Sequence, residues 1–180
     1  IKIDIVDTGI NSSIATRIYK VKKYIKSKNF LLLNGDAVFD FNIKNLYEKH
    51  MKKNKDITFL GNPAQLPYGV VIIEKNKITN FKRDIIFNSV KKNEKRSFIG
   101  YVYSGISIIN KKIMNLPFQN YENFEKDFYP KIIKNFKCDF NHIKGTWFSI
   151  DNQKDIQSLN EKRSPNYKKV KKIIKKLNAK

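Results

Sequence analysis

The apolar run Phe30-Leu31-Leu32-Leu33 constrains the fold more than any other segment of this 180-residue chain. It shows no alternation of polar and apolar side chains, which is typical of a central strand buried on both faces of an α/β sheet. Asn34-Gly35-Asp36 follows at once and ends the strand in a turn. Ligands of open α/β sheets bind at the carboxyl ends of strands, so Asp36 is a candidate site residue.

Strand-like and helix-like patterns alternate along the chain. Period-two alternation predicts a strand over residues 1–6, and apolar residues three and four apart predict helices over residues 14–25, from residue 43 onward and over residues 124–136. Ser12 or Ser13 can cap the first of these helices. This order favours an α/β fold with a mostly parallel, Rossmann-like mixed sheet flanked by helices.

The remaining elements are predicted from β-branched and aromatic runs between turn residues. They comprise strands and one hairpin, at residues 57–60, 68–73 with 78–81, 98–109, 140–143 and 146–150. Residues 62–67 are predicted to form a loop, because they include two prolines. We expect an α/β domain over residues 1–160 and a basic amphipathic helix within residues 161–180.

A second carboxylate follows another apolar segment, since Trp147-Phe148-Ser149-Ile150 leads into Asp151. Two carboxylates with open coordination positions suit Mg²⁺ that is shared with the phosphates of a substrate. Each aspartate also has an ordinary structural explanation. Asp36 could form an Asx turn, and Asp151 could cap a helix that begins near Gln153.

The net charge of +21 suggests nucleic acid, because clustered Lys and Arg neutralise phosphates. Only four of the 37 basic residues are Arg, however, and arginine is the usual reader of bases and phosphate forks. The charge therefore favours a solvated surface that attracts nucleotides and sugar phosphates, with no specific nucleic-acid partner.

Cysteine usage and hydropathy set further limits. The single cysteine, Cys138, excludes an internal disulfide and a cysteine cluster for zinc. No stretch approaches the roughly 18 to 20 apolar residues that span a bilayer, and no secretory leader is recognisable. We expect a cytoplasmic protein without a membrane span, and a homo-oligomer is left open.

Taken in order, several short motifs resemble the sugar-1-phosphate nucleotidylyltransferases, and most closely the glucose-1-phosphate cytidylyltransferases. The motifs cover roughly residues 3 to 160 and comprise Val6-Asp7-Thr8-Gly9, Arg17, Val21, Asn34-Gly35-Asp36 with Asp40 and Ile43, Tyr68-Gly69-Val70, Ser104-Gly105-Ile106, Glu125 and Trp147 to Asp155. The Gly-rich loop of the G-G-x-G-T-R kind, which opens members of the family, is not among them. We therefore expect the C-terminal two thirds of the family fold, truncated at its N-terminus.

The resemblance implies a nucleotidyl transfer. A sugar 1-phosphate would attack the α-phosphate of a nucleoside triphosphate, with CTP favoured, to give a nucleotide sugar for surface polysaccharide synthesis and pyrophosphate. Asp36 and Asp151 match the two aspartates that bind Mg²⁺ in the family and act in catalysis. We expect the 180 residues alone to be inactive, since the phosphate loop is missing.

The same resemblance implies a set of substrate-binding residues. Gly69 matches a glycine beside the substrates, Ser104-Gly105 a pair whose backbone approaches the sugar, and Glu125 an acidic residue that binds sugar hydroxyls. In the family, a lysine binds the sugar phosphate. Lys82 or Arg83 would take that role here, although Asp84 is the residue that aligns directly with the lysine. Asp7 and Trp147 lie in matching motifs and complete the set.

Three observations keep other readings open. Ile14-Ala15-Thr16 stands where the cytidylyltransferase pattern has Thr-Gly-Gly, so the choice of base is uncertain. Asp7-Thr8-Gly9 is also the motif of aspartic proteases, which need two such aspartates, and a single copy is an ordinary turn. The missing loop is compatible with a non-catalytic domain that binds a sugar phosphate or a partner protein.

Overall fold

The computed structural model describes residues 2–65, 69–83, 86–87, 90–93, 96–98, 101–117 and 123–178. The chain divides into two compact units. Unit 1 comprises Ile1–Gly35, Phe41–Phe59 and Gly105–Asn141, and unit 2 comprises Asp36–Asp40, Leu60–Ser104 and His142–Lys180. The predicted boundary near residue 160 lies within unit 2 and stays a prediction.

A mixed sheet forms the centre of unit 1. Its strands follow the order β1 (Asn29–Leu33), β9 (Tyr101–Asn110), β3 (Ile57–Gln65) and β10 (Cys138–His142). β1 and β9 are antiparallel, with Phe30 opposite Ile109. β3 and β10 run in the same direction, because the N–H of Asp56 donates to Lys137 O (2.8 Å) and that of Ile143 to Gly61 O (3.0 Å).

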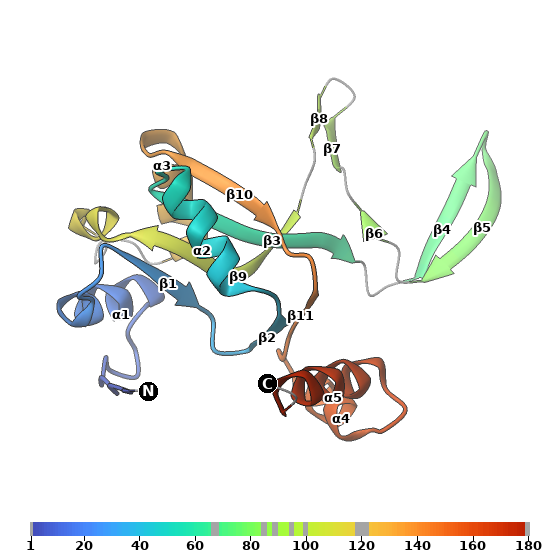
Figure 1. Cartoon of the computed structure of the whole chain (residues 1–180). Coiled ribbons are helices and arrows are strands. Elements are labelled where there is room, and N and C mark those ends of the chain that lie inside the picture. Colours follow the sequence, from blue (N-terminus) through green and yellow to red (C-terminus); the bar gives the residue numbers. More distant parts are fainter. Residues whose placement is uncertain are drawn as a thin grey trace. The chain divides into compact units, whose positions relative to one another are not determined.

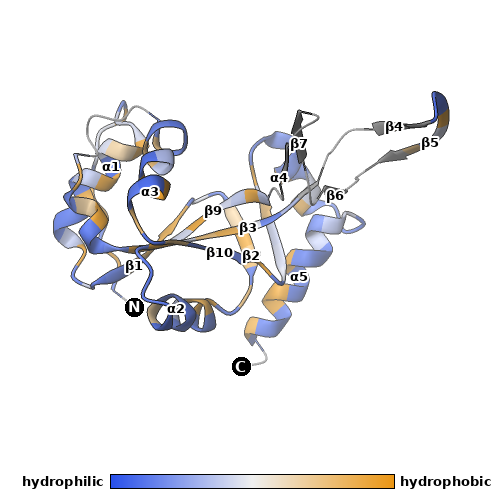
Figure 2. Cartoon of the chain, turned by 90° about the horizontal axis from the view of Figure 1, so that it is seen from above, coloured by the Kyte–Doolittle hydropathy of each residue, from blue (hydrophilic) through white to orange (hydrophobic). Residues whose placement is uncertain are grey.

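Helices cover both faces of this sheet. α2 (Ile43–Lys52) lies on one face, and α1 (Ile14–Val21) and α3 (Tyr129–Asn135) lie on the other (Figure 1, Figure 2). The 3₁₀ turns η1 (Lys22–Tyr24) and η2 (Lys111–Asn115) extend α1 and β9, and the π-helical turn η4 (Phe124–Phe128) leads into α3. The predicted α/β architecture is therefore confirmed.

Local signals set the ends of these helices. Ser13 caps α1 by accepting the N–H of Thr16 (3.2 Å), and Asn42 caps α2 by accepting that of Asn45 (2.9 Å). Pro130 stands in the first turn of α3, where its missing N–H costs no hydrogen bond. The helix predicted over residues 124–136 is present from Phe124 to Asn135 and changes from π to α geometry at Tyr129.

The core of unit 1 is aliphatic and aromatic. Side chains of β9, η2 and α3 are almost fully buried, among them Ile106, Ile108, Ile113, Met114 and Ile132. His50 is buried with them at 1% exposure, where its Nδ1 lies 2.8 Å from Thr58 Oγ1 and its Nε2 lies 3.3 Å from Asn29 Oδ1. Burial lowers the pKa of His50, so the imidazole is packed in its neutral form.

Unit 2 contains small antiparallel ribbons and two helices. The ribbons are β2 (Ala37–Asp40) with β11 (Thr146–Ser149), β4 (Gly69–Glu74) with β5 (Lys77–Arg83), and β7 (Val90–Asn93) with β8 (Arg96–Phe98). β6 (Ile86–Phe87) pairs with the end of β3. α4 (Gln153–Asn160) packs against α5 (Pro165–Asn178), the predicted amphipathic helix.

Several sequence predictions are corrected by the strand pairing. The main sheet is mixed and not mostly parallel, because β1 and β9 are antiparallel while β3 and β10 run in the same direction. Residue patterns locate strands but carry no information on their direction. The strand predicted over residues 1–6 is absent from Lys2 onward, and Ile3 and Ile5 are 79% and 94% exposed. A strand needs a hydrogen-bonding neighbour, and none of the described strands pairs with this segment.

Two further corrections concern β1 and β3. β1 lies at one end of the strand order and its residues from Phe30 onward are only half-buried or exposed, so it is not the central, doubly covered strand that its apolar run predicts. β3 continues through Pro63 to Gln65, where a loop is predicted, because residues 64 and 65 pair with β6. The strand β2 was not predicted at all.

No helix in the described part of the chain is long and apolar enough to cross a membrane.

Candidate functional site

Asp36 and Asp151 meet at one end of the β2–β11 ribbon in unit 2. The register places Ala37 opposite Ser149, so β2 begins where β11 ends. The N–H of Ile150 donates to the carbonyl of Asp36 (3.0 Å), which extends the ladder by one residue beyond the strands. Asp151 follows directly. Two residues that are 115 positions apart in the sequence are thereby held on adjacent backbones.

Asp36 lies in a turn between β1 and β2, and its carboxylate accepts no hydrogen bond from the residues that the structure describes. The Asx turn that the sequence allowed at this position is therefore not formed among them. Gly35 beside it has open space around its Cα. The carboxylate of Asp36 is available for a cation or a substrate group.

Asp151 does not cap α4. The N-cap is Asn152, whose Oδ1 accepts the N–H groups of Lys154 (2.9 Å) and Asp155 (3.2 Å). The carboxylate of Asp151 instead accepts a hydrogen bond from the hydroxyl of Ser149 (2.7 Å) and is exposed. Its second oxygen has no partner among the described residues and is left for an external group. If Asp151 capped α4, its carboxylate would instead be used by backbone N–H groups.

Asp155 is a residue whose role the sequence analysis missed. Its Oδ2 accepts the backbone N–H of Asp151 (2.9 Å) and that of Asn152 (3.1 Å), completing a capping box at the start of α4. The Asn-x-x-Asp spacing from Asn152 to Asp155 was the signal for it. Asp155 thus positions the backbone that carries Asp151.

Ser104 and Trp147 support the ribbon from within. The indole N–H of Trp147 donates to the carbonyl of Ser104 (2.9 Å), and the hydroxyl of Ser104 donates to the carbonyl of Leu60 (2.8 Å). Ser104 is 1% exposed. These polar groups form hydrogen bonds inside the protein, and the hydrogen bonds connect β11 to β9 and β9 to β3.

The register of the β4–β5 hairpin brings Gly69, Lys82 and Arg83 together. Gly69 is opposite Arg83, and Val70 is opposite Lys82. Lys75 and Asn76 form the connection with φ of 48° and 62°, as in a two-residue hairpin turn. The predicted hairpin is confirmed, and Asp84 lies outside the described residues.

The remaining predicted site residues belong to unit 1. The Oδ1 of Asp7 accepts the N–H of Gly9 (2.8 Å), so Asp7-Thr8-Gly9 forms an ordinary Asx turn with Gly9 at φ 85°. Glu125 is exposed on η4.

Gly105 adopts φ 72°, and a Cβ at this position would come within 2.7 Å of the Asn34 side chain. The close approach to Gly105 therefore comes from Asn34, whose N–H also donates to Gly105 O (2.9 Å). This contact explains why a glycine is required here without reference to a substrate.

The donor set at the β2–β11 end suits magnesium. Among the described residues no group of three or more His, Cys, Asp or Glu side chains could hold a metal. Mg²⁺ needs less than that, because it is commonly bound by one or two carboxylates together with waters and substrate phosphates. Asp36 and Asp151 would be the two carboxylates of such a site.

Comparisons with known proteins agree with this architecture. A model of the family described as Nucleotidyl transferase matches residues 2–162. The chain belongs to the nucleotidyl transferase family. The match ends just before α5 and includes both aspartates.

The curated relatives of this chain are distant in sequence. The chain is 26% identical over 161 residues to the "probable glucose-1-phosphate cytidylyltransferase" of Bacillus subtilis, covering 89% of this chain and 59% of that protein. It is 26% identical over 153 residues to the catalytic subunit beta of mannose-1-phosphate guanylyltransferase from Drosophila melanogaster, covering 77% and 38%. The chain thus spans about three fifths or less of the relatives' length.

Solved structures show the same fold. HddC from Yersinia pseudotuberculosis superposes with a TM-score of 0.54 at 21% identity, over 81% of this chain and 60% of that one. A Bacillus anthracis structure solved with sucrose gives a TM-score of 0.58 at 17% identity, over 84% and 61%. These likenesses confirm an α/β fold with a mixed sheet flanked by helices.

Proposed function

We propose that this chain carries the metal-binding and sugar-phosphate-binding part of a sugar-1-phosphate nucleotidyltransferase. The reaction joins the nucleotidyl group of a nucleoside triphosphate, with CTP favoured, to a sugar 1-phosphate and releases pyrophosphate. One observation carries the proposal: the Ile150–Asp36 backbone hydrogen bond holds Asp36 and Asp151 at one end of the β2–β11 ribbon, both with carboxylate oxygens that the protein does not use.

The residues of this end have separable tasks. Asp36 and Asp151 would hold Mg²⁺, which when bound supplies positive charge for the phosphate oxygens of both substrates. Ser149 orients the Asp151 carboxylate, and Asp155 fixes the backbone beneath it. Because the transfer needs no protein nucleophile, positioning and charge are what the chain must provide.

Phosphate binding falls to the β4–β5 hairpin in this proposal. Lys82 and Arg83 occupy neighbouring positions of β5, and the register places Gly69 opposite Arg83. Two adjacent cations compensate for the acidic Asp84 that follows in the sequence. Glu125 is proposed to bind the hydroxyl groups of the sugar, and this role rests on the family resemblance alone.

The base of the nucleoside triphosphate is the part of the substrate that the described residues specify least. Residues 14–16, which replace the Thr-Gly-Gly of the cytidylyltransferase pattern, form the first turn of α1, and Ala15 is fully buried. The N–H of Thr16 is taken by Ser13. This backbone cannot contact a nucleotide as a glycine pair does. CTP is favoured by the Bacillus subtilis relative, and the guanylyltransferase of Drosophila melanogaster makes GTP the next candidate.

Mn²⁺ binding, followed by electron paramagnetic resonance, tests the site directly. We expect the chain to bind Mn²⁺ more tightly when glucose 1-phosphate is present, because phosphate oxygens complete the coordination. Asp36→Asn and Asp151→Asn should each weaken this binding about tenfold or more, since a ligand is lost. Asp40→Asn is the matched control on the same ribbon, because the Asp40 carboxylate pairs with Lys176 at 2.5 Å.

Equal Mn²⁺ affinity in all three variants would overturn the proposed metal site. A second assay measures pyrophosphate release with CTP, GTP, UTP and dTTP and a panel of sugar 1-phosphates. A non-catalytic domain is the second candidate, because residues 14–16 form the first turn of α1 and the N–H of Thr16 is taken by Ser13, which leaves this backbone unable to contact a nucleotide. Aspartate-dependent Mn²⁺ binding without pyrophosphate release from any pair would support that second candidate.

A further inference from the structure

A pocket lined by lysines lies in unit 1, outside the residues of the candidate site. It has a volume of about 510 Å³ and is formed by Tyr19, Lys20, Lys22, Lys23 and Lys111. These residues come from α1, from η1 and from η2, three segments that the fold brings together. The pocket is wide open to solvent, and its volume lies within the range of about 300 to 1,000 Å³ found for small-molecule sites.

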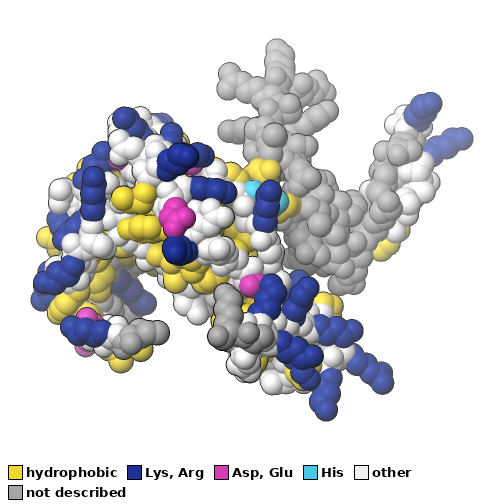
Figure 3. Space-filling view, viewed as in Figure 1, with side chains coloured by type: hydrophobic (Ala, Val, Ile, Leu, Met, Phe, Trp, Pro, Cys, Tyr) yellow, Lys and Arg dark blue, Asp and Glu magenta, His cyan; other side chains and the backbone are white. Residues whose placement is uncertain are grey.

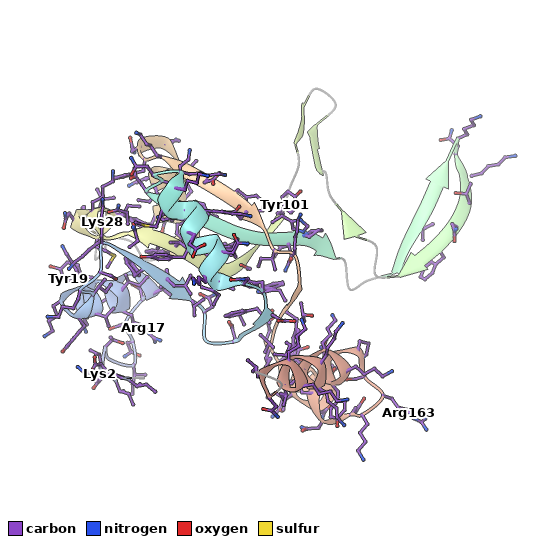
Figure 4. The ribbon with its side chains drawn as sticks, viewed as in Figure 1. Lys2, Arg17, Tyr19, Lys28, Tyr101 and Arg163 are labelled. Atoms are coloured by element: carbon purple, nitrogen blue, oxygen red, sulfur yellow. The ribbon has the colours of Figure 1, made fainter. Side chains whose placement is uncertain are left out.

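Hydrogen bonds hold the walls of the pocket in place. The N–H of Lys111 donates to Lys28 O (2.7 Å), and the Lys111 ammonium donates to Ile25 O. On the other wall, the Lys20 ammonium donates to Thr8 O (2.8 Å) and contacts Ser12 Oγ at 3.4 Å. Figure 4 shows Tyr19 and Lys28 at the same end of unit 1.

The positive charge of this pocket is not neutralised by the protein. The ion pairs described in unit 1 use other lysines, namely Lys2, Lys53 and Lys112. Within the described residues, the ammonium groups of Lys20 and Lys111 contact neutral oxygens only. Lys22 and Lys111 are also half-buried, so water screens their charges less than it screens a fully exposed lysine.

Four like charges around one pocket repel each other, and the repulsion is relieved when an anion enters. Figure 3 shows Lys and Arg side chains spread over the surface of unit 1. A single phosphate brings at most two charges, whereas a chain of phosphates brings as many charges as the pocket has lysines. Lysine ammonium groups act as point charges without fork geometry, which suits a flexible chain of phosphates.

We propose that this pocket binds a polyphosphate chain, either inorganic or as the phosphates of a nucleotide. Lys20, Lys22, Lys23 and Lys111 neutralise the phosphates, and the half-exposed ring of Tyr19 forms one wall. The site is separate in its residues from Asp36 and Asp151, so its occupancy does not depend on the proposed transferase function.

Isothermal titration calorimetry of the full chain with inorganic tripolyphosphate, at fixed ionic strength, tests the proposal. The pocket variant is Lys22→Glu with Lys23→Glu. The matched control is Lys168→Glu with Lys172→Glu on α5, which changes the net charge equally at exposed positions. We expect the pocket variant to weaken binding about tenfold or more and the control about twofold or less.

Equal weakening in the two variants would overturn the proposal, because it would assign binding to the overall charge. Unchanged binding in the pocket variant would also overturn it. A milder variant, Lys22→Gln with Lys23→Gln, keeps the test valid if charge reversal unfolds the chain. Its far-ultraviolet circular dichroism and its Mn²⁺ binding should match those of the parent chain.

The source of the phosphates is resolved by titrating ATP beside tripolyphosphate. Tighter binding of ATP that is lost in Tyr19→Ala supports a nucleotide, and equal binding of both supports the phosphate chain alone. Binding of single-stranded DNA that both double variants weaken equally, with no binding of tripolyphosphate, would contradict the pocket and favour a diffuse nucleic-acid surface.

Discussion

At the scale of single residues, the environment of each side chain separates chemistry from packing. Asp36 and Asp151 have carboxylate oxygens that form no hydrogen bond with the described residues. The polar groups of Ser104 and Trp147, by contrast, form hydrogen bonds inside the protein. Asp7 does the same in its turn. Residue type and motif predicted all five residues as site residues. Only their contacts show which of them have polar atoms left to bind a ligand.

Gly105 offers a prediction on stability. Gly105→Ala should lower the free energy of unfolding by about 1 to 3 kcal/mol, because an alanine at φ 72° is strained and its Cβ meets Asn34 at 2.7 Å. Urea denaturation followed by Trp147 fluorescence measures this. Gly35→Ala is the matched control, since nothing lies within 4 Å of a Cβ there, and it should change stability little. Equal effects at both positions would contradict the contact.

His50 predicts a pH dependence. Burial lowers its pKa in the folded state below the ordinary 6.5, while Asp139 and Asp56 act weakly in the opposite direction. The unfolded chain therefore binds the proton more readily. The stability contributed by neutral His50 should be complete above pH 6.5 and should be lost as the pH falls below it.

Urea denaturation at several pH values checks this window. The pKa of Asp56 is also lowered, through hydrogen bonds from Lys112 and Lys137 that outweigh its burial, but its contribution is lost only below its ordinary value of 3.8. His50→Gln should remove the loss of stability below pH 6.5, and His142→Gln should retain it. The same pH profile in both variants would rule out His50 as the cause.

At the scale of elements, the helices followed from local signals, whereas a predicted strand formed only where another strand pairs with it. Caps at Ser13 and Asn42 and the apolar spacing of α1, α2 and α5 depend on residues within one or two turns. Residues 1–6 have an equally regular pattern but no described strand beside them, and β2 forms only because β11 pairs with it. A helix satisfies its own backbone, whereas a strand needs a partner.

The capping box at α4 gives a prediction for an element. Asp155→Ala should cost about 1 kcal/mol of stability and should also weaken Mn²⁺ binding, because the backbone N–H of Asp151 loses its acceptor. Asn152→Ala removes the other half of the box but leaves Asp151 N–H bonded, so it should lower stability with a smaller effect on Mn²⁺. Equal Mn²⁺ affinities in the two variants would show that Asp155 serves the helix alone.

At the scale of the whole molecule, charge dominates. The chain carries +21 at neutral pH, and the ion pairs described involve only four lysines. Salt should therefore stabilise the fold by screening repulsion. We expect the urea midpoint to rise between about 0.05 and 0.5 M NaCl, over which the Debye length falls to a few ångströms. A falling midpoint would mean that attractive pairs outweigh the repulsion.

The sequence by itself determined the α/β class, the family and the helices and singled out the two candidate aspartates, because each depends on residue type, short-range spacing or motif order. Tertiary structure alone decided that β1 stands at the end of the sheet order, that the sheet is mixed, and that Asp36 lies beside Asp151. The backbone contact between Ile150 and Asp36 joins segments separated by more than a hundred residues. No local pattern specifies such a pairing, because it depends on the path of the intervening chain.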